Sequence, residues 1–520
     1  MTEAVGRAAD NRSAAQPRRR TSVVSGGALG AVGAVVSAAG GFALVLVVTR
    51  TLGAADSGRF FLAVAVFTVL IAVGKLGTDT SLVRFVSVLL ARGRDDQVVP
   101  LAVRAAVVVL VVSGLVGVVI FVLSRPLAAL LVADPSGDDQ VLLRWVAVGL
   151  PLGAVTLTLL GATRGAGSVA TFVWVEQVFK PLARPAAVVV VCALGAGVVG
   201  AFVAWLVPAV LGLAVVFVSM RARLRGARAG EAPSGPPVGG AEFWRFALPR
   251  ALSGTLEVFS LWIGVMMLSA LTGSADAGVF TAVARVVTAG LMVMVAMRLA
   301  LGPHLGAAFE HRQLDRVEAL HAHSTTWAVL VSFPFFLLVA VFADVVLEVF
   351  GAGFEAGAAA LTVLAAANLV NVAVGNVQSI VLMCGRSSWT LVGTTSALAV
   401  QVLLGLALIP SYGLVGAAWA FGAGVVVNNL VAWWQVSHGL RLRVWSRPVV
   451  AALLLTTAVF GGGGLAARAW IGSGLLAAVL VASVGTVAIV AVALARPRLL
   501  DLPAGYRVLA RRFDPTGATT

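Results

Sequence analysis

Stretches of 20 or more mainly apolar residues recur along the whole chain, and this repetition limits the folds that are open to it. Each stretch is long enough to cross a bilayer as an α-helix, which satisfies its own backbone hydrogen bonds. The runs are too long and too rich in Leu, Val and Ala for the alternating strands of an outer-membrane barrel. With 60% hydrophobic and 11% charged residues, the chain is also far too apolar for a soluble domain. An all-α integral membrane protein is therefore predicted.

We expect about fourteen transmembrane helices, each given by one apolar run. The predicted spans are 26–49, 59–77, 100–124, 141–162, 170–194, 198–219, 248–270, 278–300, 324–346, 359–383, 389–409, 413–436, 448–468 and 473–495. The first span is too long for a cleavable signal peptide and lacks a small-residue cleavage pattern. The basic N-terminal tail, residues 1–25, is therefore expected to stay in the cytoplasm.

Arginine-rich segments alternate with poorly charged ones in the order that this topology requires. The arginines cluster after the second, sixth, eighth and twelfth spans and at the C-terminus, which places all of these segments inside by the positive-inside rule. The net charge of +15 then faces an anionic inner leaflet and needs no nucleic-acid partner. We predict a multi-pass protein of the plasma membrane with both termini cytoplasmic. Its only cysteines, Cys192 and Cys384, fall near opposite membrane faces, so no disulfide is expected.

One loop pattern, G-x-A-D-x-G-x-F, occurs twice, 220 residues apart. The matching residues are Gly53, Asp56, Gly58 and Phe60 in the first copy and Gly273, Asp276, Gly278 and Phe280 in the second. Both copies join two predicted spans on the outside. The glycines allow a tight helix-loop-helix connection, the aspartates are expected to cap the following helices, and the phenylalanines re-enter the bilayer. This loop is interpreted as scaffold.

A second repeated pattern extends the duplication. "GVVGA" at 197–201 and "GLVGA" at 413–417 each join two spans at nearly the same offset. We infer two parallel six-helix repeats that form two lobes, at 26–219 and 248–436, followed by two extra C-terminal helices at 448–495. Residues 220–247 form a basic, Pro/Gly-rich cytoplasmic linker, and 496–520 a cytoplasmic C-terminal tail. Residues 302–322 are expected to be an amphipathic helix at the membrane interface.

The sequence offers little for catalysis or for cofactors. It has no Walker A pattern and no clustered metal ligands, and "HAH" at 321–323 is interpreted as solvated, so neither a cofactor nor a metal is expected. A membrane-embedded polymerase or ligase is the alternative of another class. Such enzymes carry catalytic residues on large external loops, whereas the longest one here, 125–140, offers only Asp134, Asp138 and Asp139, interpreted as solvated turn residues. We therefore expect a transporter that is not an enzyme.

Ionisable residues inside predicted spans are the most informative candidates, because each is costly there and usually faces a cavity or a partner. The candidate cavity cations are Lys75, Arg84, Lys180, Arg184, Arg250, Arg285 and Arg298, with Glu176 and Glu257 as coupling groups or structural ion-pair partners. The chain has 35 arginines but only two lysines, and both lysines fall within spans. A compact ammonium kept at these two positions hints at a function.

Each candidate also has a structural interpretation. Glu176 and Lys180 are four residues apart and can neutralise each other, and Glu257 can pair with Arg285 on the neighbouring helix. Lys75, Arg250 and Arg298 lie within snorkelling distance of the inner interface. Arg184 keeps no acidic partner once Glu176 takes Lys180, which makes it the best candidate for an anion ligand. Surplus positive charge suits a diphosphate head group. Polar residues of two spans could add sugar contacts or equally form hydrogen bonds between helices, namely Asn368, Asn371, Asn376, Gln378 and Gln401.

Several stretches resemble a known family when they are taken in order. "TRTLGAADSGRFF" and "GTDTSLVRF" are similar to R-x-L-G-x-x-x-x-G-x-F and L-V-R-F signatures, and "VFGAGFEAGAAALTVLA" and "LIPSYGLVGAAWA" follow at matching places. In these stretches the chain resembles the polysaccharide (Wzx-type) flippases of the MOP exporter superfamily. Lipid II flippases and MATE antiporters share that fold, but the first span lacks the carboxylate that many MATE proteins use for coupling.

The resemblance implies a two-lobed bundle that flips an undecaprenyl-diphosphate-linked oligosaccharide from the inner to the outer leaflet by alternating access. It implies a lipid-linked oligosaccharide, membrane lipids and polysaccharide assembly proteins as partners. Only Arg84 is carried over from the family motif. The other cations are inferred from this sequence alone. The identity of the sugar and the coupling ion stay open.

Overall fold

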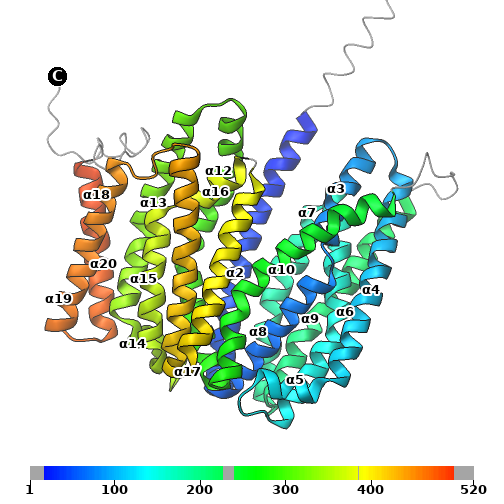
Figure 1. Cartoon of the computed structure of the whole chain (residues 1–520), viewed down its shortest axis with the longest axis horizontal. Coiled ribbons are helices and arrows are strands. Elements are labelled where there is room, and N and C mark those ends of the chain that lie inside the picture. Colours follow the sequence, from blue (N-terminus) through cyan, green and yellow to red (C-terminus); the bar gives the residue numbers. More distant parts are fainter. Residues whose placement is uncertain (1–16, 227–238, 385, 497–520) are drawn as a thin grey trace, which may run out of the picture. The chain divides into compact units, whose positions relative to one another are not determined.

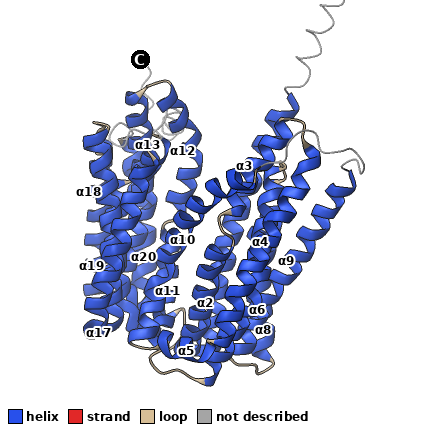
Figure 2. Cartoon of the chain, turned by 45° about the vertical axis from the view of Figure 1, so that its right-hand side comes forward, coloured by secondary structure: helices blue, strands red, loops and turns tan. Residues whose placement is uncertain are grey.

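Every regular element in the computed structural model is a helix, within the residues that it describes, 17–226, 239–384 and 386–496 (Figures 1 and 2). The first group of elements is α2 (Pro17–Gly74), α3 (Thr78–Ala91), η1 (Asp95–Gln97), α4 (Val98–Val122), α5 (Ser124–Leu131), α6 (Gly137–Gly165), α7 (Val169–Phe172), η2 (Val173–Phe179), α8 (Lys180–Ala193) and α9 (Val198–Gly226). The second group is α10 (Gly240–Leu271), α11 (Ser274–Gly290), α12 (Met292–Glu310), α13 (Leu314–Val341), α14 (Ala343–Glu348), η3 (Phe354–Gly357), α15 (Ala358–Val374), α16 (Val377–Met383), α17 (Ser387–Trp434), η4 (Gln435–Gly439), α18 (Arg447–Thr456), η5 (Thr457–Gly462), α19 (Gly463–Trp470) and α20 (Leu475–Ala495). The all-α membrane fold is confirmed.

The apolar helices follow the predicted spans in order. Ten described helices are long and apolar enough to cross a membrane, or up to eleven if the bent pair formed by α11 and the start of α12 counts as one span. Two of the helices are kinked where the sequence predicts a loop, at Gly53 (φ 72°) in α2 and at Gly413 (φ 50°) in α17. Each kink divides one long helix at the boundary between two predicted spans. The number fourteen itself stays a prediction.

The described residues form two compact units. Unit 1 contains the chain up to Val48, Val66–Leu127 and Gln140–Thr255, and unit 2 contains Thr49–Ala65, Ala128–Asp139 and the chain from Leu256 onward. The predicted lobe boundaries stay a prediction. Parts of the two tails and of the linker, residues 1–16, 227–238 and 497–520, lie outside the described residues.

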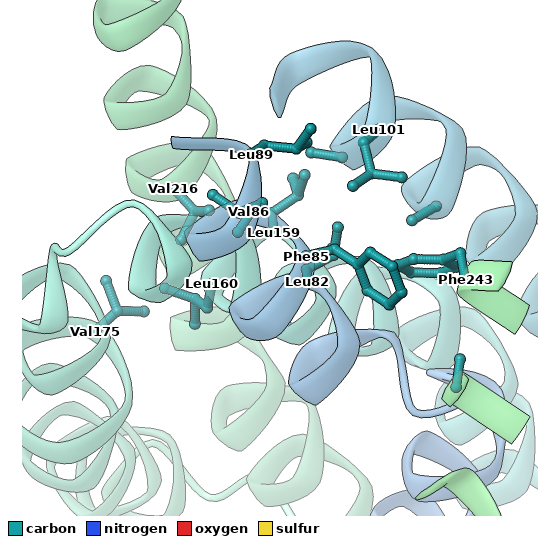
Figure 3. Packing of buried hydrophobic residues seen from close by; sticks show 14 residues of the cluster. Leu82, Phe85, Val86, Leu89, Leu101, Leu159, Leu160, Val175, Val216 and Phe243 are labelled. Carbon is teal, nitrogen blue, oxygen red and sulfur yellow. The ribbon is translucent and has the colours of Figure 1, made fainter. Parts of the chain in front are cut away.

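A hydrophobic core of unit 1 joins six elements, α3, α4, α6, η2, α9 and α10 (Figure 3). Its centre is Phe85 of α3, whose ring lies 5.4 Å from the ring of Phe243 in α10. Leu101 of α4, Leu159 of α6 and Val216 of α9 belong to the same core. The sequence did not predict α3 as a helix. It is amphipathic, and its apolar side is what anchors the core.

The two copies of the repeated loop pack against each other within unit 2. Gly53 and Gly273 have positive φ angles, 72° and 115°, and so start a new helix directly after the preceding one. A Cβ atom on Gly58 would collide with the carbonyl oxygen of Ser274, and one on Gly278 with that of Ala54. These contacts are reciprocal, because Ala54 corresponds to Ser274 and Gly58 to Gly278 in the repeat. Two like helix ends therefore touch backbone to backbone.

The aspartates of this loop do not cap helices, contrary to the expectation. Gly273 occupies the N-cap position of α11 without any side-chain hydrogen bond, and Asp276 lies inside the first turn, where a carboxylate favours the positive end of the helix dipole. Asp56 instead accepts a hydrogen bond of 2.8 Å from Arg59. Phe60 and Phe280 are completely buried, at 0% and 1% exposure. They fill the core beside the loop.

The expected interfacial helix at 302–322 is wrong as well. Residues of this range end α12 at Glu310 and begin α13 at Leu314, with a short turn between them. His321 in α13 is 3% exposed, and its Nε2 lies 3.4 Å from the hydroxyl of Thr325, so it is not solvated. Asp139 is likewise buried rather than solvated. Its carboxylate accepts hydrogen bonds from the backbone and hydroxyl of Ser136.

Leucine at position 58 should destabilise the protein, because no side-chain rotamer can move its Cβ away from the Ser274 carbonyl oxygen. Overpacking of this kind costs about 1–3 kcal/mol or more, and we expect Gly58→Leu and Gly278→Leu each to lower the midpoint of thermal unfolding in detergent. Gly254→Ala is the control, since a Cβ there meets open space. An unchanged midpoint for both leucine variants would mean that the loops do not touch.

Candidate functional site

Glu176 and Lys180 form an ion pair in unit 1, in which the lysine is buried and the glutamate half-buried. Glu176 belongs to η2, a π-helical segment, and Lys180 is the first residue of the α-helix that follows. The Lys180 ammonium donates to Glu176 Oε1 and is only 4% exposed. π-Helical turns are rare and occur often at functional sites. The pair neutralises itself, so it contributes no net charge to its surroundings.

Arg184 lies one turn further along α8 and has no carboxylate within ion-pair distance. Its guanidinium carbon lies 4.0 Å from the ring centroid of Trp205 on α9, a cation–π contact. The rings of Phe67 and Phe202 hold Trp205 in place at 5.4 Å and 5.6 Å. The Arg184 Nε is buried and finds no hydrogen-bond acceptor among the described residues. This donor is available to an anion.

Arg164 at the end of α6 joins the same cluster, although it is not among the residues predicted from the sequence. Its guanidinium stacks on Phe172 at 4.5 Å and interacts electrostatically with Asp79 and Glu176. Its Nε is buried without an acceptor. Arg164 falls just outside the predicted span 141–162, in a segment that the sequence predicts to be a loop. Only the length of α6, which continues to Gly165, reveals its place.

Lys75 and Asp79 complete the cluster. The Lys75 ammonium lies 2.9 Å from Asp79 Oδ2, across the short break between α2 and α3. A Cβ on Gly161 would collide with the Asp79 carbonyl oxygen, so α6 and α3 pack backbone to backbone here. This contact brings the start of α3 close to the end of α6. The cluster comprises the four cations Lys75, Arg164, Lys180 and Arg184 and the two carboxylates Asp79 and Glu176, a net charge of +2.

Arg84 and Arg250 lie elsewhere in unit 1. Arg84 on α3 is exposed, with its guanidinium carbon 4.4 Å from the ring centroid of Phe246 on α10. Arg250 on α10 is exposed as well. Neither forms an ion pair with the buried cluster.

The remaining candidates belong to unit 2. Arg285 on α11 is half-buried, whereas Arg298 on α12 and Glu257 on α10 are exposed. Among the described ion pairs, none joins Glu257 to Arg285. The predicted structural pair is therefore wrong.

Two of the polar residues of span 359–383 have hydrogen-bond partners within unit 2, whereas the buried amide of Asn376 has none among the described residues. Asn368 donates a hydrogen bond of 2.8 Å to the Leu364 carbonyl oxygen, and Asn371 donates one of 3.3 Å to the side-chain oxygen of Asn368. Gln401 accepts a hydrogen bond of 3.0 Å from the hydroxyl of Ser260. The two asparagines thus bond within α15 itself, whereas Gln401 of α17 bonds across to α10, so all three side chains have partners inside the protein. Among the described residues, no group of three or more His, Cys, Asp or Glu is placed to hold a metal ion.

Comparison with known proteins agrees with this fold. The lipid II flippase MurJ in an inward closed conformation has a TM-score of 0.63 at 10% identity, covering 89% of this chain and 99% of that one. An inward-facing multidrug resistance MATE family transporter of the MOP superfamily has a TM-score of 0.61 at 18% identity, covering 78% of this chain and 95% of that one. At such low identities these similarities show the fold alone.

Similarity in sequence shows the family of the chain as well as its fold. The probable low-salt glycan biosynthesis flippase Agl15 of Haloferax volcanii is 22% identical over 215 residues, which cover 39% of this chain. The match spans 44% of that relative's length, so less than half of it is represented. The family model described as polysaccharide biosynthesis protein matches residues 23–309, more than half of the 520 residues. The predicted resemblance is confirmed, and the chain belongs to the polysaccharide biosynthesis protein family of multi-pass membrane proteins.

Proposed function

We propose that the protein is a flippase that moves an undecaprenyl-diphosphate-linked oligosaccharide from the inner to the outer leaflet by alternating access. The observation that carries the proposal is Arg184, a cation held on Trp205 with a buried donor that lacks an acceptor. Arginine binds phosphate oxygens through paired hydrogen bonds, and a diphosphate needs more positive charge than one side chain supplies. The net charge of +2 in the surrounding cluster meets that need.

Family membership supports a glycan cargo. Agl15 is named as a glycan biosynthesis flippase, and MurJ as a flippase for lipid II, which makes a lipid-linked glycan the shared theme. A MATE-type exchange of cations fits less well, because the first half of α2 has no carboxylate and the cluster is positively charged. Enzymatic activity is not part of the proposal.

Alternating access requires two lobes that move against each other and a fixed orientation in the membrane. The lobes 26–219 and 248–436 rock about the linker to expose the cations to each side in turn, and both termini face the cytoplasm. Arginine-rich segments on one side support this orientation through the positive-inside rule. Polysaccharide assembly proteins are proposed partners on the outer side, where the cargo arrives.

Translocation in a minimal system tests the proposal. Proteoliposomes that contain only this protein should move a labelled lipid-diphosphate-oligosaccharide between leaflets, measured by loss of accessibility to an enzyme added outside. Protein-free liposomes and liposomes with heat-unfolded protein are the controls. Chain growth of the oligosaccharide without any movement would instead identify a polymerase or ligase and contradict the proposal.

A further inference from the structure

An apolar groove opens on unit 1 between α4, α6 and α9. It holds about 710 Å³, within the roughly 300–1,000 Å³ of ligand pockets. Its main lining residues are Val103, Val107, Leu110, Pro151, Val155 and Phe217. None of its lining side chains carries a polar group, so the groove suits a hydrocarbon chain and nothing that needs hydrogen bonds.

The groove exists because two helices touch at one end and diverge at the other. α4 and α6 are in contact at Gly117, where a Cβ would lie 2.7 Å from the carbonyl oxygen of Ala147. About two to three turns away, at Val107 and Val155, the space between them is open. Valine, alanine and proline make up more than half of the lining, beside larger residues such as Leu110 and Phe217. Leu159 at its base belongs to the core of unit 1 (Figure 3).

The matching helix of the second repeat is covered by protein. α13, the third helix of that repeat, packs against α18, η5 and α19, and Leu330 and Leu337 of α13 join a core with Phe460. The appended C-terminal helices occur only once in the chain. On α4, in contrast, Val103, Val107 and Leu110 stay 50%, 51% and 50% exposed.

A cation marks one end of the groove. A second hollow of about 360 Å³ shares Val103 and Val107 with the first and adds Arg104 and Trp244. Arg104 is exposed, and its Nε donates a hydrogen bond of 3.1 Å to the Pro100 carbonyl oxygen. Among the described residues it forms no ion pair. The side chain thus turns toward the start of α4, as a snorkelling arginine does. Trp244 beside it is typical of the membrane interface.

We propose that this groove binds one anionic phospholipid of the leaflet in which α4 begins, with an acyl chain along α4 and its phosphate on Arg104. From Leu101 to Leu110 the two hollows extend along about 14 Å of helix at 1.5 Å per residue, close to half of a roughly 30 Å hydrocarbon core. One acyl chain fills that depth. The charge of Arg104 selects the head group.

Other occupants fit less well. A partner helix about 10 Å wide and 14 Å long occupies roughly 1,100 Å³, more than the main groove holds. The cargo's diphosphate is proposed to bind the cluster around Arg184, and no residue of that cluster lines the groove. The groove is therefore a separate site for a resident lipid.

Photolabelling tests this site. The full-length protein in nanodiscs is irradiated with phosphatidylglycerol that carries a photoreactive acyl chain, and labelled peptides are mapped by mass spectrometry. We expect label on α4 and α9 at the groove, and about tenfold less in Val107→Trp. Val118→Trp is the matched control on the same helix, because Val118 is 61% exposed and lies outside the groove. Ala214→Leu is a second, milder filling variant, and thermal unfolding verifies that each variant folds.

Competition identifies the head group. Unlabelled phosphatidylglycerol should displace the label from the groove, phosphatidylcholine at the same mole fraction should not, and Arg104→Gln should remove this difference. Equal labelling of the groove and the Val118 face, unchanged by Val107→Trp and Ala214→Leu, would mean bulk bilayer lipid only and overturn the site. Displacement by a polyprenyl phosphate but not by phosphatidylglycerol would overturn the phospholipid in favour of the cargo's chain.

Discussion

Lys180→Met is expected to destabilise the protein by about 3 kcal/mol, because it leaves the half-buried Glu176 carboxylate without its hydrogen-bonded partner. Methionine keeps the length and the apolar stem of lysine, so packing changes little. A lower midpoint of thermal unfolding in detergent measures the effect. Expression in the membrane should fall with it.

The double variant Glu176→Gln/Lys180→Met separates structure from function. With both charges gone, most of the stability should return, since a neutral pair of similar shape often replaces a buried ion pair without loss. If Lys180 also binds a phosphate oxygen of the cargo, translocation should stay at least about tenfold below wild type even though the net charge of the cluster is unchanged, because one charge-assisted hydrogen bond is lost. Full recovery of translocation together with stability would show that Lys180 serves the fold alone.

Arg184→Gln is expected to reduce translocation by about 10- to 100-fold at normal expression. A hydrogen bond to a charged group contributes about 1.5–3 kcal/mol, and each 1.4 kcal/mol corresponds to a factor of ten. Arg184 forms no ion pair among the described residues, so its loss should cost the fold little. Transport in proteoliposomes and thermal unfolding are measured side by side.

Two controls sharpen this result. Arg184→Lys keeps the charge but loses the paired hydrogen bonds and should recover part of the transport. Arg125→Gln removes an exposed arginine of α5 and should leave transport unchanged. Unchanged transport in Arg184→Gln would remove Arg184 from the cargo site and leave its stacking on Trp205 as a structural contact.

Three of the four cations in the cluster could be predicted from the sequence. Lys75, Lys180 and Arg184 stand out because a charge inside an apolar run is costly wherever the helix lies. Arg164 was missed because it sits at the edge of a run, where hydropathy cannot separate a helix end from a loop. Glu257 and Arg285 were paired wrongly, since neighbouring helices at similar depth need not turn their charges toward each other.

The sequence by itself determined the all-α membrane fold, the order of the spans and the duplication. The fold class and the spans follow from the free energy of transferring each apolar segment into lipid, which depends only on residues close together in the sequence. The duplication is visible directly as a repeated pattern. Only the tertiary structure decided that the two repeated loops pack against each other through Gly58 and Gly278, that Arg164 joins the cluster, and that α4 and α6 diverge into a groove. Such features depend on contacts between residues far apart in the sequence, for which hydropathy carries no signal.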